Sequence, residues 1–305
     1  MITSTGTPGL FVTASLARRI ERAEATMIEE GATAAMQRVG REHVLLRHLA
    51  GGVVAFTDAG SPFNKVAGLG FGGVPDESAL DDIEREFSRR ECAVQAEVSS
   101  LADPEVARLL TRRGYELVNF ENVLGLALDG QAAAPTDAGA PVRIAPTGPE
   151  DDGLWIDTVA TGFLHPDTFD GPVSHETFGR EALERVYTDT IAAPSFERYL
   201  AWRGNDVAGG ASLRVFDGVA QLCGAATLPD HRRHGVQTTL LRHRLASAAA
   251  RGCDLAVVTT EPGSKSQQNV QRFGFTLLYV RAILVKPAGM PSKPAGGLML
   301  EEPRA

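Results

Sequence analysis

One order of sequence features occurs twice in the chain and limits the folds that it can adopt. The matching segments are 90–98, Gly114-Tyr115 and 122–128 in the first copy, and 251–258, Gly274-Phe275 and 281–285 in the second. Cys92 lies 22 positions before Gly114, and Cys253 lies 21 positions before Gly274. Each copy predicts a strand, a helix, a Gly-aromatic turn and a strand. We interpret this as duplication of one α/β unit, with chance similarity between two unrelated units as the alternative.

The boundaries of the two halves follow from length and composition. The 305 residues exceed one ordinary compact domain and suffice for two. Residues 131–141 lie in a stretch rich in Ala, Gly, Pro and Asp without periodicity, which is typical of a linker. A similar composition predicts a flexible tail at 288–305. The predicted domains are therefore 1–130 and 142–287.

Hydrophobic periodicity predicts a mixed α/β sheet in both halves. The first half is expected to open with a helix capped by Ser15. Its further elements are expected as strands at 43–49, 52–57 and 66–71, a helix at 78–90, a strand at 92–98, a helix at 104–113 and strands at 115–119 and 122–128. The second half is expected to have helices at 150–161 and 177–193, strands at 197–203, 207–215 and 219–228, a helix at 237–251, a strand at 254–259, a helix at 264–273 and strands at 275–279 and 281–286.

Charge and composition exclude several classes of protein. The net charge of −8 argues against a nucleic-acid binder and is compatible with a cationic substrate. No stretch approaches the ~20 apolar residues of a membrane span, and no signal peptide is apparent. Three scattered cysteines form neither a disulfide framework nor a zinc motif. His231 and His234 lack a carboxylate pair, so we expect no metal site. Without a signal peptide or a membrane span, we expect the protein to be cytoplasmic.

A basic loop with one glycine lies between an expected strand and an expected helix of the second half. Residues 228–237 read Leu-Pro-Asp-His-Arg-Arg-His-Gly-Val-Gln. The glycine lets the backbone approach a ligand closely. The first amides of the helix have no partner within it, and the helix dipole is positive at that end. Such a loop is suited to a pyrophosphate, and its arginines add positive charge.

This loop resembles the phosphate loop of the GNAT acetyltransferase superfamily, Gln/Arg-x-x-Gly-x-Gly/Ala, which follows a strand ending in an apolar residue and a proline. Arg232, Gly235 and Gln237 take those places, and Gln237 departs from the usual small residue. The segment 262–275, a helix ending in Gly-Phe, is also similar to the family. The resemblance covers residues 142–287. It implies an N-acetyltransferase domain that uses acetyl-CoA and releases CoA.

The resemblance also implies which residues contact the cofactor. Amides at the helix start would bind the pyrophosphate, and the end of the preceding strand would pair with the pantetheine arm like an added strand. The implied cofactor-binding residues are Ala226, Thr227, Leu228, Arg232, Arg233, His234, Gly235, Val236, Gln237, Thr238, Ser264, Ser266 and Asn269.

The first half lacks such a loop. Residues 68–77 read Gly-Leu-Gly-Phe-Gly-Gly-Val-Pro-Asp-Glu, without a basic residue and with two acidic residues at the end. We expect no CoA there. We interpret residues 1–130 as a degenerate GNAT-like domain that packs on or shapes the acceptor cleft, so that the fold is two GNAT-like domains in tandem.

The acid that would assist the leaving thiolate is not marked by the usual residue. Many family members place a tyrosine four residues before the glycine of the Gly-Phe pair, where this chain has Val270. Ser264 and Ser266 are candidate thiolate donors, or they simply cap the helix. Tyr279 is either a further candidate or a core strand residue. The missing tyrosine leaves catalysis to water and amides or indicates a weak enzyme.

The candidate general base lies in the polar segment 165–176, where the family has its acceptor loop. Glu176 and His175 are the candidates, with a solvated loop as the alternative. Asp167 or Asp170 could instead bind a cationic acceptor. An alkyl ammonium with a pKa near ~10.4 must lose a proton before it attacks a thioester.

Two functions follow from these features. The first is an enzyme that moves an acetyl group from acetyl-CoA to a primary amine of a small molecule or a protein. The second is a CoA-binding regulatory or scaffold protein with little or no turnover. We expect no nucleic-acid or membrane partner, and a homodimer stays open beside the monomer.

Overall fold

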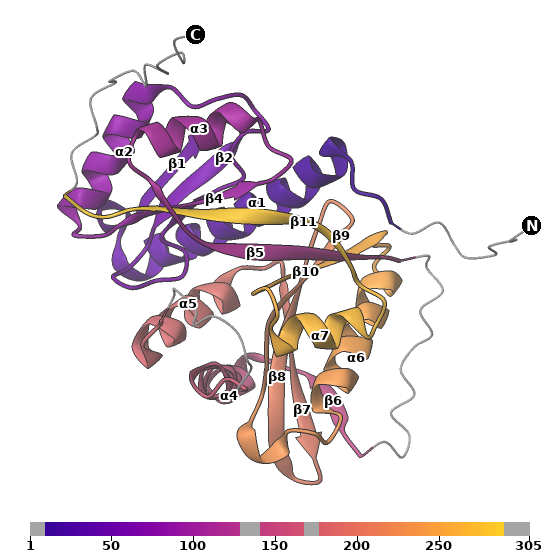
Figure 1. Cartoon of the computed structure of the whole chain (residues 1–305). Helices are drawn as coiled ribbons and strands as arrows, with labels where there is room; N and C mark the ends of the chain where they lie inside the picture. Colours follow the sequence, from indigo (N-terminus) through magenta and orange to yellow (C-terminus); the bar gives the residue numbers. More distant parts are fainter. Residues whose placement is uncertain (1–9, 129–140, 168–176, 290–305) are drawn as a thin grey trace, which may run out of the picture.

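All eleven strands of the described residues form one mixed sheet. The computed structural model describes residues 10–128, 141–167 and 177–289. The expected linker at 131–141, except for its last residue, and the expected tail at 288–305, except for its first two residues, lie outside these ranges. Across the sheet the strands follow the order β1-β2-β3-β4-β11-β5-β10-β9-β8-β7-β6. The mixed α/β sheet predicted from the sequence is therefore confirmed, as one continuous sheet (Figure 1).

The elements repeat in a similar order along the two halves. The first half contains α1 (Ala14–Val39), β1 (Leu45–Leu49), β2 (Gly52–Phe56), β3 (Lys65–Ala67), α2 (Glu77–Arg89), β4 (Val94–Ser99), α3 (Pro104–Arg112) and β5 (Glu116–Ala127). The second contains β6 (Arg143–Pro146), α4 (Asp152–Leu164), α5 (Arg180–Ala192), β7 (Phe196–Arg203), β8 (Asp206–Phe216), β9 (Val219–Thr227), α6 (Val236–Ala250), β10 (Leu255–Thr260), α7 (Lys265–Gln271) and β11 (Thr276–Lys286).

The last strand of each half lies within the other half. β11 pairs with β4 on one side and with β5 on the other, while β5 pairs with β10 (Figure 1). All three pairings are antiparallel. The two halves therefore share one sheet and exchange their final strands. The predicted domains, 1–130 and 142–287, are successive segments of the chain and do not include this exchange.

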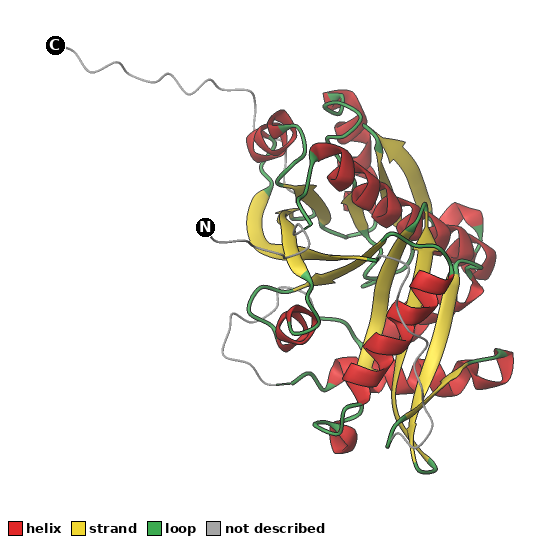
Figure 2. Ribbon diagram, turned by 90° about the vertical axis from the view of Figure 1, so that its right-hand side faces the viewer, coloured by secondary structure: helices red, strands yellow, loops and turns green. Residues whose placement is uncertain are grey.

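Helices cover both faces of the sheet (Figure 2). In β8, Ala211 and Leu213 share a hydrophobic core with α6. A Cβ on Gly210, which directly precedes Ala211, would meet Trp155 and Val159 of α4, on the opposite face. In the first half, α1 packs on Val53 and neighbours, while α2 and α3 pack on the alternate residues. One face thus carries α1, α4 and α5, and the other carries α2, α3, α6 and α7.

Several expected boundaries were wrong, for local physical reasons. Thr13, not Ser15, caps α1, because its Oγ1 accepts from the amide of Leu16 at 3.1 Å. The strand expected at 66–71 ends at Ala67, because Gly68 turns into the left-handed region with φ of 74°.

β5 and β11 are each one long strand instead of two short ones. The expected strands were separated by gaps at residues 120–121 and at residue 280. Glu121, in the first gap, and Arg281, directly after the second, are instead paired across the two strands, with Arg281 Nη1 2.8 Å from Glu121 Oε2. A cross-strand ion pair therefore lies where the strands were expected to be interrupted.

No helix of the described residues is long and apolar enough to cross a membrane.

Candidate functional site

The basic loop leads directly into α6. Gly235 caps this helix in the left-handed conformation, with φ of 80° and ψ of 3°. The first backbone hydrogen bond of the helix runs from the Thr239 amide to the Gly235 carbonyl, at 2.9 Å. No described residue accepts from the amides of Val236, Gln237 and Thr238. These free amides lie at the positive end of the helix dipole, an arrangement that suits an anion.

The space beside this helix start is open. A Cβ on Gly235 would meet no atom within 4 Å, so a ligand could reach the backbone there. Arg233 is also left-handed, with φ of 63°, and its side chain is exposed. The His234 ring Nδ1 lies 2.7 Å from the Arg232 carbonyl oxygen. The loop therefore presents backbone amides and an exposed cation on one surface.

Arg232 has a different role from its neighbour. Its Nη1 lies 3.2 Å from Asp167 Oδ1, and its Nη2 donates to the His165 carbonyl oxygen. These contacts fix the loop against the residues that follow α4. Asp167, which the sequence suggested as a cation-binding residue, is therefore paired within the chain, while Arg233 forms no ion pair among the described residues.

The sheet opens next to the loop. β9 and β10 run parallel but pair only from Val219 to Gln221 of β9, after which the strands diverge. An extra residue of β9 opposite β8 forms a bulge at Gly224, with φ of 53°. Beyond Gln221, the β10-facing edge of β9 has no strand partner among the described residues. The hydroxyl of Thr227 is buried there without a hydrogen-bond partner.

An added extended chain can pair with such an edge. Thr227 and Ala226 pair on their other side with β8, and the Leu228 amide donates to the Ala208 carbonyl at 3.0 Å. The free edge therefore belongs to a strand that is rigidly held by its other neighbour. The three residues expected to contact pantetheine lie at this opening.

The segment after β10 contributes the other wall. The Ser264 hydroxyl accepts from the Gln267 amide at 3.1 Å, so it caps α7 as the alternative interpretation held. Ser266 and Val270 line a cavity, whereas Asn269 is half-buried outside its lining. Val270, at the position of the family's tyrosine, is 3% exposed and belongs to the core under α6.

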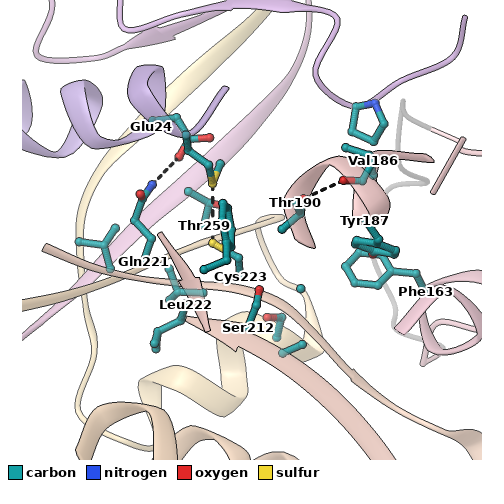
Figure 3. Close-up of a pocket in the computed structure, with 18 of the residues that line it drawn as sticks. Glu24, Phe163, Val186, Tyr187, Thr190, Ser212, Gln221, Leu222, Cys223 and Thr259 are labelled. Carbon is teal, nitrogen blue, oxygen red and sulfur yellow. Dashed lines mark hydrogen bonds between the residues drawn. The ribbon is translucent and has the colours of Figure 1, made fainter. Parts of the chain in front are cut away.

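A cavity of about 370 Å³ extends from this opening into the molecule (Figure 3). Gln237 and Ser266 line it on the side of α6 and α7, and Glu24 and Met27 of α1 line it on the other side. Because α1 and α6 cover opposite faces of the sheet, the cavity passes between the diverging β9 and β10. The phosphate-loop side and the first half of the chain thus meet in one cavity.

The structure does not place the expected general bases. Glu176, His175 and Asp170 lie outside the described residues. Tyr279, the other expected acid, is 4% exposed in a core cluster, and its hydroxyl donates to Glu21 at 2.7 Å. It does not line the cavity.

Cys223 also lines the cavity. Burial has the largest effect on the Cys223 thiol, and together with the negative charge of Glu24 it raises the pKa of this thiol to about 12. A thiol in that state is a poor nucleophile at neutral pH. All three cysteines are free, and no cluster of three metal-ligating side chains occurs in the part of the chain that the structure describes.

Sequence reasoning missed the charged groups that the first half brings to this cavity. Glu24, Lys65 and Glu121 line it, although they lie far from the loop in sequence. Glu121 and Arg281 each lie within a largely apolar strand sequence. Such a position is a sequence signal for a buried charge, and it could have indicated these two residues. The pairing of β5 with β11 could not be foreseen from either run alone.

Comparisons with known proteins agree with this geometry. Residues 164–275 match the model of the acetyltransferase (GNAT) family. The fold is similar to a GCN5-related N-acetyltransferase from Kribbella flavida, with 20% identity, a TM-score of 0.59, and 88% of this chain and 96% of that one covered. It is also similar to a tandem GNAT protein from the clavulanic acid biosynthesis pathway, with 14% identity, a TM-score of 0.56 and coverage of 92% and 98%.

A third solved structure, a GCN5-related N-acetyltransferase from Sphaerobacter thermophilus, is 16% identical, with a TM-score of 0.51 and coverage of 90% and 94%. No curated protein matches the chain. At these identities the solved structures bear on the fold alone, whereas the family model matches the segment that contains the loop. Residues 164–275 therefore carry a domain of the GNAT acetyltransferase family, and the described residues have a fold similar to that of a tandem GNAT protein.

Proposed function

We propose that this protein transfers an acetyl group from acetyl-CoA to a primary amine. The observation that carries the proposal is the start of α6, where three unpartnered amides and a left-handed Gly235 face open space at the mouth of the cavity. Acetyl-CoA would supply the acetyl group as an activated thioester. The cytoplasmic location expected from the sequence stays a prediction, as do the absence of nucleic-acid and membrane partners and the homodimer.

The residues present fit such a cofactor. The amides of Val236, Gln237 and Thr238 would hold the pyrophosphate, and exposed Arg233 would add positive charge. The free edge of β9 and the unpartnered hydroxyl of Thr227 would accept the amide-bearing pantetheine arm. The cavity between β9 and β10 would then admit the amine from the side of α1.

A second function rests on one observation. Val270 supplies no hydroxyl at the place where the family has its tyrosine, and Ser264 uses its own hydroxyl to cap α7. A protein with this loop but without an acid could bind CoA as a regulatory or scaffold protein. Ser266 remains the exposed hydroxyl of this segment that lines the cavity.

The two functions are separated by measuring binding and turnover on the same protein. Calorimetry with CoA tests the cofactor site, and release of free thiol from acetyl-CoA across a panel of amines tests the transfer. We expect micromolar binding and amine-dependent release. Tight binding without release above background on any amine would support the regulatory protein, and absence of binding would contradict both functions.

A further inference from the structure

Four carboxyl groups gather around one guanidinium at the inner end of the cavity. Arg281 Nε lies 2.8 Å from Glu21 Oε1, and its Nη1 lies 2.8 Å from Glu121 Oε2. Its Nη2 lies 3.7 Å from Glu24 Oε2, and its Nη1 lies 3.8 Å from Glu97 Oε2. The carboxyls come from α1, β4 and β5 and the guanidinium from β11. The exchanged strands therefore create the cluster.

The cluster contains more negative than positive groups. Lys65 Nζ lies 2.5 Å from Glu97 Oε1, so Lys65 and Arg281 are the two cations of the described residues that pair with the four carboxyls. Arg214 lies close by, but it pairs with Glu30 at 2.8 Å. With all groups ionised, the cluster has two unmatched negative charges. Buried charges of one sign are costly unless an opposite charge reaches them.

Only part of the cluster is accessible from the cavity. Glu24, Glu121 and Lys65 line it, whereas the side chains of Glu21 and Glu97 are almost fully buried. The Glu121 side chain is 27% exposed, the most accessible of the four carboxyls. Gln221 donates from Nε2 to Glu24 Oε2 at 3.2 Å and so fixes that carboxyl at the wall (Figure 3). The cluster thus presents Glu121 and Glu24 to anything bound in the cavity.

Glu121 lies beside the opening of the sheet. Its neighbour Asn122 pairs with Thr260, the last residue of β10. Adjacent strands lie about 4.8 Å apart, so Glu121 is next to the end of β10 where β9 has diverged most. Thr259 and Val258 of the same strand line the cavity. Glu121 is therefore positioned at the junction between the opening and the charged end.

The protonation of Glu121 depends on the whole cluster. Burial has the largest effect on the pKa of Glu121, and together with the negative charge of Glu97 it raises this pKa to about 7. The positive charges of Arg281 and Lys65 act in the opposite direction and lower it. The charged and titratable groups around it are Glu21 and Glu24 of α1, Lys65 of β3, Glu97 of β4, and Tyr279 and Arg281 of β11. A carboxyl in this range exchanges protons readily near neutral pH.

The rest of the cavity wall is apolar and aromatic. Six rings line it, one from the first half and five from the second: Phe63, Trp155, Phe163, Phe178, Tyr187 and Phe196. Trp155 and Tyr187 pack edge to face, with centroids 5.6 Å apart. A volume of about 370 Å³ is sufficient for a small molecule and not for a folded partner. A ligand that fits would combine one positive charge with an apolar body.

We propose that the acceptor is a small primary amine with an apolar body and no carboxylate, and that Glu121, supplied by the half without a phosphate loop, is its general base. This inference rests on the proposed acetyl transfer. Glu24 contributes negative charge that attracts the ammonium, and the aromatic wall holds the apolar body. The carboxyls disfavour any acceptor that carries a carboxylate next to its amine.

The proton and electron balance of the step is simple. The ammonium of the acceptor gives one proton to the Glu121 carboxylate. The free amine then forms a C–N bond to the thioester carbonyl carbon, and the C–S bond breaks. The nitrogen gives up its second proton, and the leaving thiolate of CoA takes up a proton. The products are the N-acetyl amine and CoA thiol, with the first proton passing from Glu121 to water.

The test of substrate class compares phenethylamine with phenylalanine, which differs by one carboxylate, and with butylamine, which lacks the ring. We expect kcat/KM to be at least tenfold higher for phenethylamine than for either. Equal values for phenethylamine and phenylalanine would overturn the inference. An enzyme that acetylates none of the three, yet binds phenethylamine in the presence of CoA, would overturn the proposed turnover and leave the acceptor site standing.

The test of the base uses Glu121→Gln, with Glu116→Gln as control because Glu116 is exposed on the same strand. We expect Glu121→Gln to lower kcat about 100-fold and to remove the fall in kcat/KM below about pH 7, with acetyl-CoA affinity unchanged. The control should behave like the wild type. Retention of kcat and of the acidic limb in Glu121→Gln would overturn the role of Glu121.

A second measurement tests the inference even if the Glu121→Gln variant does not fold. Glu24→Gln removes one charge of the cluster without touching the β5–β11 pairing. We expect calorimetry with CoA present to show phenethylamine binding weakened at least fivefold in this variant. Unchanged binding would overturn the attraction by the acidic cluster, independently of any turnover.

Discussion

The two halves of this protein have a similar order of elements but opposite charges at one helix start. In the first half, α2 begins after Asp76 and carries Glu77 in its first turn. In the second half, α6 begins after Gly235, carries no acidic residue in its first turn and follows a basic loop. Carboxylates at the α2 start already satisfy its dipole, whereas the α6 start is left for an outside anion. Under the proposed function, a few side chains at one helix terminus would separate the half that binds the cofactor from the half that does not.

The loops before these helices differ in openness as well. A Cβ on Gly70 would lie 2.8 Å from Ala102, and the Gly70 carbonyl accepts from the Asp103 amide at 3.1 Å. Gly72 donates to the Ala50 carbonyl at 3.2 Å. The first-half loop is thus closed on its own neighbours at Gly70 and Gly72. A Cβ on Gly235 would meet no atom within 4 Å, which leaves room for a ligand at this helix start.

The prediction with the largest expected effect tests whether the two halves unfold independently of each other. Leu110 is 1% exposed in the first-half core, and Leu110→Ala should lower the free energy of unfolding by roughly 3–5 kcal/mol. Both tryptophans, Trp155 and Trp202, lie in the second half. Because the final strands are exchanged, tryptophan fluorescence and circular dichroism should shift together in a denaturant titration.

A matched control for this variant is Leu154→Ala, because Leu154 is 41% exposed and its loss should change stability little. Fluorescence that keeps its wild-type midpoint while the dichroism shifts would show that the halves unfold independently, against the shared sheet.

The next effect converts the open helix start into one like that of α2. Gly235→Glu adds bulk and negative charge at the amides and should weaken CoA binding at least 100-fold, or about 2.7 kcal/mol. The control is Gly73→Glu, since Gly73 also has a positive φ, 104°, and open space around it. Calorimetry should show a loss in the first variant alone. Equal affinities in both would remove the phosphate site from this loop.

The smallest effect concerns the unpaired cation of the loop. Arg233→Ala should weaken CoA binding three- to tenfold, or about 1 kcal/mol, with a smaller difference at high salt. Arg112→Ala, an equally exposed arginine of the first half, is the control and should change nothing. A salt-independent effect of Arg233→Ala would argue against a charge interaction.

The sequence predicted what depends on neighbouring residues. The basic loop between a strand and a helix, the missing basic residues at 68–77 and the similar order of elements in the two halves are local patterns. Ser264 as a helix cap also follows from local chemistry, and its Oγ does accept from the Gln267 amide. These features required no knowledge of how distant strands pair.

The acidic cluster could not be predicted in the same way. It depends on β11 lying between β4 and β5, which places Arg281 opposite both Ser99 and Glu121. Strands of a duplicated fold have similar composition, so nothing in an apolar run with one charge tells which half it will join. The sequence therefore points to a general base in the segment 165–176 and carries no signal for one in β5.

The exchange of final strands also has a consequence for synthesis. A chain leaves the ribosome from its N-terminus, and domains generally fold as they emerge. Here the edges of β4 and β5 lack their common partner until residues 276–286 have been translated. Unpaired strand edges are prone to pair with other chains. The sheet of the first half therefore stays incomplete and prone to aggregation until translation of the second half supplies β11.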